Sequence, residues 1–124
     1  MIAFTGVDHV QLAAPPSSEA EARAFYGALL GLEEITKPPA LAARGGCWFQ
    51  CGAQQIHIGI ETEFRAAKKA HPALRLADQA GFDGLVMRLT EQRFAIKRDD
   101  EEIPGVTARF FVADPWGNRL EFVV

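Results

Sequence analysis

The stretch DPWGNRLEFVV, residues 114–124, joins a turn to a short alternating strand. Pro115 presets the turn, and Gly117 and Asn118 are residue types that tolerate a positive φ. Side chains alternate between the two faces of a strand, so Glu121 points away from the apolar residues on either side of it. A slip of one residue would move Glu121 to the opposite face. The turn therefore fixes the direction of this carboxylate.

Working outward from this stretch, the same order of elements is found twice in the chain. In the first half, strand alternation, helical spacing and Gly/Pro boundaries predict a strand over 7–13, a helix over 18–30, and strands over 32–37, 47–51 and 54–61. After a polar connector, residues 62–69, they predict a strand over 71–78, a helix over 79–92, and strands over 94–98, 107–112 and 119–124. The sequence therefore predicts an α+β fold of two βαβββ modules, about 1–61 and 70–124, in a single domain of residues 1–124.

Local signals add detail to this order. Ser18 with Glu21 three residues later predicts a capping box at the start of the first helix, and Gly31 marks its end. Cys47 and Cys51 lie on one predicted strand, about 13 Å apart, which is too far for a disulfide. We expect both to be free thiols that pack in the interior. The acidic run 98–102 is expected to be a solvated loop.

Composition narrows the classes of function. With 124 residues, of which 48% are hydrophobic, the chain is long enough for one domain with its own core. A net charge of −3 and the absence of a basic cluster argue against nucleic-acid and membrane-surface partners. The first residues lack the pattern of a signal peptide, and no apolar run is long enough to span a bilayer. We therefore expect a cytoplasmic protein.

The three histidines and Glu121 occupy matching positions in the two halves. His71 follows His9 by 62 residues, and Glu121 follows His57 by 64. A single strand histidine is more often structural, but this matched set favours metal binding, because imidazole and carboxylate are common ligands of Zn, Ni, Fe, Mn and Co. A divalent cation would also offset the cost of burying the carboxylate. The sequence predicts a divalent metal site with the ligands His9, His57, His71 and Glu121.

Four further side chains are predicted to line a substrate cavity. Arg75 and Arg119 share strand faces with candidate ligands, where a guanidinium can hold a carboxylate or phosphonate; the alternative is that they are surface arginines. Gln11 and Trp48 form a second lining, in which Trp48 either stacks on a flat substrate or simply packs in the fold.

The segments DHVQLA, AFYGALLGL, HPALRLAD and DPWGNRLEFVV resemble the vicinal oxygen chelate superfamily, the group of glyoxalases, bleomycin-resistance proteins and extradiol dioxygenases. The resemblance covers essentially the whole chain. It implies curved mixed sheets around a metal-containing cavity, in a homodimer that shares its sites between subunits. His9 and His57 of one subunit would then meet His71 and Glu121 of the partner subunit.

The resemblance also implies an enzyme that uses a bound metal as a Lewis acid on a small oxygen-bearing substrate. The two arginines indicate that this substrate can be anionic. The reaction is left open among lyase or isomerase chemistry, ring-cleaving dioxygenation and thiol transfer. His57 stands where the glyoxalase I pattern usually has a second carboxylate. Glu121 is therefore the expected general base. His57 either binds the metal or acts as a base that does not itself bind the metal. The rivals are a metal-free protein that sequesters a drug, as the bleomycin-resistance members do, and a member that binds metal without turnover.

Overall fold

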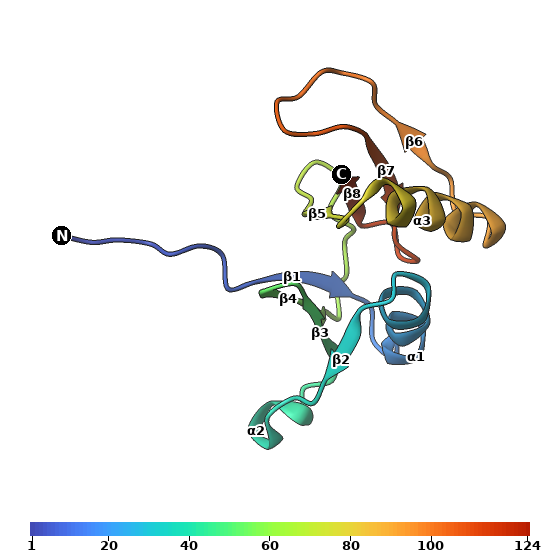
Figure 1. Ribbon diagram of the computed structural model, residues 1–124. Helices are drawn as coiled ribbons and strands as arrows, with labels where there is room; N and C mark the ends of the chain where they lie inside the picture. The colour runs from blue at the N-terminus through green and yellow to red at the C-terminus, as the bar shows by residue number, and fades with distance from the viewer. The chain divides into compact units, whose positions relative to one another are not determined.

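The computed structural model describes residues 1–124. Contacts divide the chain into two compact units, Met1–Phe64 and Arg65–Val124, which we call module one and module two. Each module contains a four-stranded sheet, and the strands are labelled in Figure 1. Module one consists of β1 (His9–Ala14), α1 (Glu19–Ala22), η1 (Arg23–Leu29), β2 (Glu33–Ile35), α2 (Pro39–Ala42), β3 (Cys47–Cys51) and β4 (Gln54–Ile60). Module two consists of β5 (Ala73–Arg75), α3 (Gln79–Glu91), β6 (Lys97–Arg98), β7 (Arg109–Ala113) and β8 (Arg119–Val123).

The two sheets have the same topology. Their strand orders are β1-β4-β3-β2 and β5-β8-β7-β6, so the first and last strands of each module are neighbours. In each sheet that pair is parallel and the other pairs are antiparallel. The sheets are therefore mixed, and the predicted α+β fold of repeated βαβββ order is confirmed.

The helix of each module packs on one face of its own sheet. In module one, Tyr26 of η1 is fully buried, and its ring lies 5.9 Å from that of Phe49 on β3. In module two, Phe82 of α3 meets the Phe110 ring of β7 at 5.2 Å. Alternate strand residues are buried beneath these helices, because side chains at every second position share a face. The other face of each sheet is left for the candidate site residues.

The first helix begins differently from the prediction. Ser18 precedes it, but its side chain makes no capping hydrogen bond to the helix; its hydroxyl donates to the Pro15 carbonyl instead. The predicted capping box with Glu21 is therefore wrong, because the hydroxyl is used in the preceding turn. Most of the helix is the π-helical segment η1, and Gly31 follows its end with a φ of 81°. The short helix α2 was not predicted.

The strands of module two are shorter than predicted. Only Ala73–Arg75 of the 71–78 segment pairs as a strand, so His71 lies just before β5. Within 94–98 only Lys97–Arg98 pairs, and β7 begins at Arg109 rather than at residue 107. The two cysteines are free, as expected, and Cys47 is buried while Cys51 is half-buried.

The predicted turn before β8 is closed by one buried carboxylate. Asp114 Oδ1 accepts hydrogen bonds from the backbone N–H groups of Trp116 at 3.0 Å and Asn118 at 2.8 Å. The Asn118 side chain donates to Asp114 Oδ2 at 2.9 Å and accepts from Ala67 N–H at 2.9 Å. Gly117 has the positive φ expected of it, 96°. Asp114 and Asn118 thus fix the start, and with it the register, of β8.

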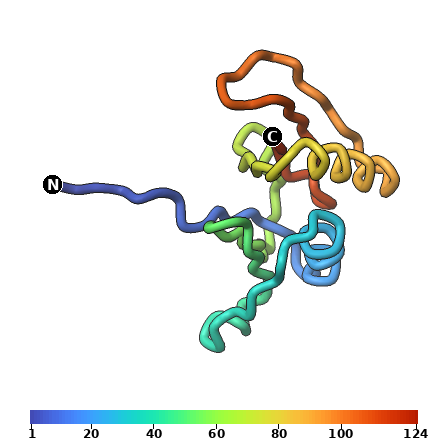
Figure 2. Tube along the Cα trace, in the orientation of Figure 1, coloured from blue at the N-terminus to red at the C-terminus, as the bar shows by residue number.

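Residues 1–8 belong to neither sheet and run as an extended segment into β1, which is plain in the trace of Figure 2. Met1, Ile2 and Phe4 are exposed within it. The longest helix, α3, has 13 residues, and no helix of the chain has the length and apolarity needed to cross a bilayer.

Candidate functional site

Module one brings His9 and His57 together through the pairing of β1 with β4. His57 is the partner of Gln11, which lies two residues after His9 on the same strand face. The two imidazole rings stack with centroids 4.1 Å apart and planes 14° from parallel. His9 is exposed over 44% of its side chain, and its Nδ1 lies 2.8 Å from Asp8 Oδ2. A proton on Nδ1 donates to that carboxylate and leaves the lone pair on Nε2, the arrangement commonly found in metal-binding histidines.

His57 is more enclosed than His9. Its ring is held between that of His9 and that of Trp48, which lies 4.1 Å away and nearly parallel. Its Nε2 lies 2.9 Å from Gln55 Oε1, which as an acceptor places the proton on Nε2 and the lone pair on Nδ1. Burial is the main cause that lowers the pKa of His57, and the neighbouring His9 adds to it. His57 is therefore a neutral side chain near pH 7.

The stack limits what the two rings can do together. A metal bound by an imidazole lies near the plane of the ring, along the lone pair of one nitrogen. The planes of His9 and His57 are nearly parallel and the rings are stacked, so the two lone pairs do not converge on one point. Both histidines can bind the same ion only if one ring turns, and the exposed His9 has more room to do so than the buried His57.

Module two brings together His71 and Glu121 in the same register. Glu121 is the partner of Ala73, which lies two residues after His71, as Gln11 lies two residues after His9. His71 Nδ1 lies 2.8 Å from the Lys69 carbonyl, which can only accept a hydrogen bond. Nε2 therefore carries the lone pair of a neutral His71, and it lies 4.0 Å from Glu121 Oε1.

Arg109 connects Glu121 to a second carboxylate. Its Nη1 donates to Glu121 Oε1 at 3.0 Å, and its Nη2 lies 2.8 Å from Asp99 Oδ2. Both contacts were missed in the sequence, where 98–102 was expected to be a solvated loop. The signal was available in part: Phe111 lies opposite Glu121, so Arg109 occupies the diagonal position on the same face.

The structure therefore shows two pairs of the predicted ligands, one in each module. Within either module, His, Cys, Asp and Glu side chains do not gather in groups of three that could hold a metal ion. Each pair offers nitrogen and oxygen atoms of the kinds that Zn, Ni, Fe, Mn and Co bind. The hydrogen bonds to His9, His71 and Glu121 are of the kind that orients metal ligands. The chemistry of the donor set fits a divalent metal.

Comparisons with known proteins identify the family to which the chain belongs. The family model of the Glyoxalase/Bleomycin resistance protein/Dioxygenase superfamily matches residues 6–122. The chain belongs to this superfamily. A search of curated proteins gave no match.

Several solved structures resemble this member of the superfamily. A glyoxalase family protein from Bacillus anthracis is 49% identical with a TM-score of 0.90, and the match covers 99% of this chain and 97% of the other. The lactoylglutathione lyase from Agrobacterium tumefaciens is 21% identical with a TM-score of 0.70, covering 98% of this chain and 94% of the other. A fosfomycin resistance protein from Listeria monocytogenes is 16% identical with a TM-score of 0.75, covering 98% and 92%. At these lower identities the likeness shows the fold alone.

Three of the four residues predicted to line a substrate cavity make contacts within this glyoxalase-superfamily chain. Trp48 stacks on His57, which accounts for its packing. The Gln11 amide fills the space above Gly59, where an added Cβ would lie 2.4 Å from Nε2. Arg75 donates to the Gly105 carbonyl at 3.2 Å.

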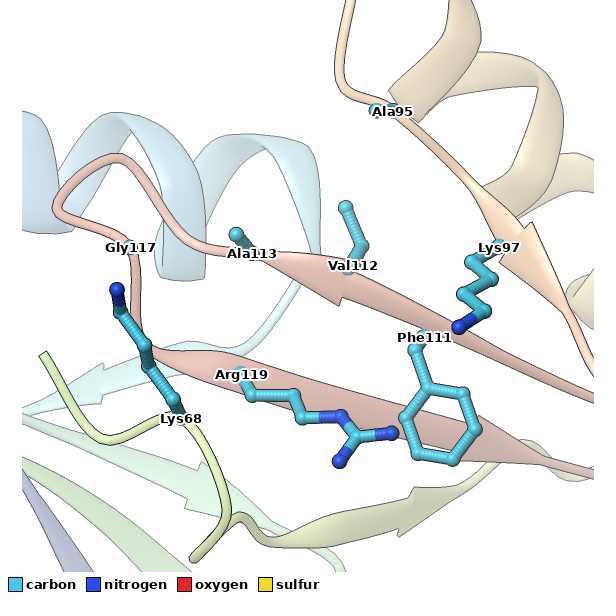
Figure 3. A pocket seen from close by; sticks show the side chains of 8 residues that line it. All are labelled: Lys68, Ala95, Lys97, Phe111, Val112, Ala113, Gly117 and Arg119. Carbon is cyan, nitrogen blue, oxygen red and sulfur yellow. The ribbon is translucent and has the colours of Figure 1, made fainter.

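Arg119 lines a pocket of about 290 Å³ in module two, shown in Figure 3. Its guanidinium lies over the Phe111 ring, 4.1 Å from the centroid. Lys68 and Lys97 line the same pocket and were not predicted as site residues, since one lies in the polar connector and the other in a strand too short to show alternation. The remaining lining residues are Ala95, Val112, Ala113 and Gly117.

Proposed function

We propose that this chain is a metal-dependent enzyme of the glyoxalase superfamily that acts on a small oxygen-bearing molecule. The observation that carries the proposal is the equivalent register of the two pairs. In each sheet a histidine lies two residues before the strand partner of the second candidate ligand. Independent structural histidines have no reason to repeat this placement in both modules.

We assign three ligands, His9, His71 and Glu121. Each has a neighbour suited to orient it: Asp8 for His9, the Lys69 carbonyl for His71, and Arg109 for Glu121. Two imidazole nitrogens and one carboxylate suit Fe, Zn, Ni, Co or Mn, and this set is the facial triad of many Fe(II) oxygenases. A divalent cation held there supplies Lewis acidity that stabilises negative charge developing on a substrate oxygen.

His57 is assigned to the wall of the site rather than to the metal. Its ring is fixed by Trp48 and His9, and its Nε2 by Gln55, which leaves Nδ1 as a proton acceptor. Glu121 is the other group that can accept a proton from a bound substrate. A reaction that moves a proton would use one of these two side chains. Lyase or isomerase chemistry, ring-cleaving dioxygenation and thiol transfer all remain compatible with this arrangement.

We further propose a homodimer with shared sites, in which His9 of one subunit joins His71 and Glu121 of the partner subunit. The proposal rests on the superfamily resemblance and on the division of the ligands between the modules. Mixing His9→Ala chains with Glu121→Ala chains would test it. One intact metal site per heterodimer is expected after subunit exchange, and metal-free heterodimers would contradict it.

Metal analysis tests the proposed function itself. Protein purified without chelator should carry about one metal ion per chain, and His9→Ala, His71→Ala and Glu121→Ala should each lose it. His57→Phe keeps a ring between Trp48 and His9, so this control should retain the metal. Loss of metal in His57→Phe, with unchanged folding by circular dichroism, would make His57 a ligand and remove the three-ligand assignment.

A metal-free binding protein is the second candidate function. It is favoured by one specific contact, since Arg109 already provides a positive charge beside Glu121 at 3.0 Å. Parent protein that contains no metal, and takes up neither Fe(II), Zn nor Ni in equilibrium dialysis, would support this candidate and contradict the metal-dependent one.

A further inference from the structure

The pocket beside Arg119 is lined by cations from three separate segments. Lys68 comes from the connector before β5, Lys97 from β6 and Arg119 from β8, and no acidic residue is among the lining residues. Figure 3 shows the Lys97 amine and the Arg119 guanidinium directed toward Phe111, and the Lys68 side chain rising along the turn at Gly117. The charges of Lys97 and Arg119 therefore lie on the Phe111 side of the pocket, and that of Lys68 lies on the Gly117 side.

These cations differ from Arg109, which lies nearby on the same sheet. Arg109 is compensated by two carboxylates, Asp99 and Glu121. Lys68, Lys97 and Arg119 form no ion pair with a carboxylate, although Lys97 lies near enough to Asp99 to help lower the pKa of that carboxyl. Their mutual repulsion would be relieved by a bound anion.

Phe111 orients the guanidinium of Arg119 in a way that suits anion binding. The ring supports the flat face of the guanidinium, which is only partly exposed. A stacked guanidinium keeps its N–H edge available, and that edge matches two oxygens of an oxyanion. The stack also reduces the freedom that Arg119 would lose on binding.

The pocket lies next to the proposed metal ligand in module two. Phe111 is the strand partner of Glu121, and Arg119 precedes Glu121 by two residues on the same face. Two residues of a strand span about 7 Å. A single small molecule can therefore reach both the pocket and the metal position beside Glu121.

We propose that this pocket binds a phosphate or phosphonate group of the substrate, while the chelating oxygens of the same molecule reach the metal position beside Glu121. The inference deepens the proposed function and rests on it for the chelating end. A doubly charged oxyanion is favoured over a carboxylate, because Lys68, Lys97 and Arg119 together present three positive charges. The substrate class is a small phosphorylated or phosphonylated compound with vicinal oxygens.

A titration of chelator-treated protein tests the pocket without the metal. Inorganic phosphate is the probe, followed by isothermal titration calorimetry, with acetate as the comparison anion. Lys97→Gln and Arg119→Gln should each weaken phosphate binding about tenfold, since each removes a charge-assisted contact. Arg98→Gln is the matched control: it removes the neighbouring charge on β6, outside the pocket, and should leave the affinity unchanged.

Metal content and thermal unfolding of the same variants separate the two proposals. Both pocket variants should keep the metal of the parent and its Tm, because neither residue is a ligand or lies in the core. Phosphate affinity that does not differ between the pocket variants and Arg98→Gln, or acetate bound as tightly as phosphate, would overturn the pocket assignment even if metal is present. The pocket variants could instead lose phosphate binding in a chain that never binds metal. That result would contradict the proposed enzyme and the substrate class, and would leave only an anion site.

Discussion

The two modules share a backbone register but surround their candidate ligands differently. An aromatic residue lies opposite the ligand position on the neighbouring strand in both: Trp48 opposite His57, and Phe111 opposite Glu121. In module one, the aromatic ring forms part of a neutral stack. In module two, the ring of Phe111 meets that of His71 edge-on at 5.5 Å and also lies against the guanidinium groups of Arg119 and Arg109.

This difference indicates that the two modules share the positions of their side chains on the sheet but not the contacts around those side chains. Strand pairing places a side chain on a given face, whatever the side chain is. The contacts around it depend on each residue, so the equivalent position is enclosed by aromatic rings at His57 and paired with Arg109 at Glu121. Module one thus contains a stack of aromatic rings around His57, and module two contains a set of ion pairs around Glu121.

The largest expected effect comes from the turns that set the two registers. Module one joins β3 to β4 through the exposed Gly52-Ala53 turn, whereas module two joins β7 to β8 through a turn closed by the buried carboxylate of Asp114. Asp114→Ala leaves several buried hydrogen-bonding groups without their acceptor and should lower the free energy of unfolding by about 3 kcal/mol. Urea denaturation measures it.

Ala53→Ser is the corresponding control in module one and should change stability by less than about 0.5 kcal/mol. Equal effects of the two substitutions would show that the turns contribute alike, and would remove the contrast between them.

The aromatic stack of module one should give the next largest effect. Trp48→Ala removes half-buried surface and one of the two rings that enclose His57, so it should cost about 2 kcal/mol of stability. Trp48→Phe keeps an aromatic face and should cost less than about 1 kcal/mol. If both variants are equally unstable by urea denaturation, stacking does not hold His57 in place.

The ion pairs of module two can be tested through metal affinity. Arg109→Met removes the hydrogen bond to Glu121 at 3.0 Å and should weaken metal binding about tenfold, the usual effect of losing a group that orients a ligand. Competition with a chromogenic chelator measures it. Arg98→Met removes a nearby charge without touching Glu121, and an equal loss in that variant would assign the effect to general electrostatics.

Much of the fold followed from the sequence because its signals are local. Alternation in CWFQC and QQIHIGI predicted β3 and β4 closely, and helical spacing predicted α3 within a residue. The strand predicted over 71–78 is longer than the observed Ala73–Arg75, because strand propensity does not reveal where pairing with β8 stops. The capping box failed because the Ser18 hydroxyl had a competing acceptor in the turn.

The candidate site was predicted less completely than the fold. Its ligand candidates repeat in sequence, which made them visible, and their pairing by module is a consequence of strand register. Arg109, Lys68 and Lys97 have no repeated counterpart, and their roles depend on which residues lie across a sheet or beside a turn. Such contacts between distant residues were not encoded in any local pattern.

The smallest expected effect concerns Asp99, which acts on the site only through Arg109. The pKa of Asp99 is lowered from 3.8, first by the hydrogen bond from the Glu101 backbone N–H and then by Arg109. A carboxyl with a lowered folded pKa stabilises the fold above its unfolded pKa, and this contribution is lost as the pH falls through the folded value. Asp99→Asn should therefore be less stable than the parent at about pH 6, and the difference should shrink by about pH 3.

Asp100→Asn is the matched control, because Asp100 is exposed and lies beside Asp99. Urea denaturation at both pH values should show no pH-dependent difference between this variant and the parent. If Asp99→Asn behaves in the same way, the Asp99 contact does not hold Arg109 in solution. The charged surroundings of Glu121 would then depend on Arg109 alone, and module two would be less ordered around its ligand than the stacked module one.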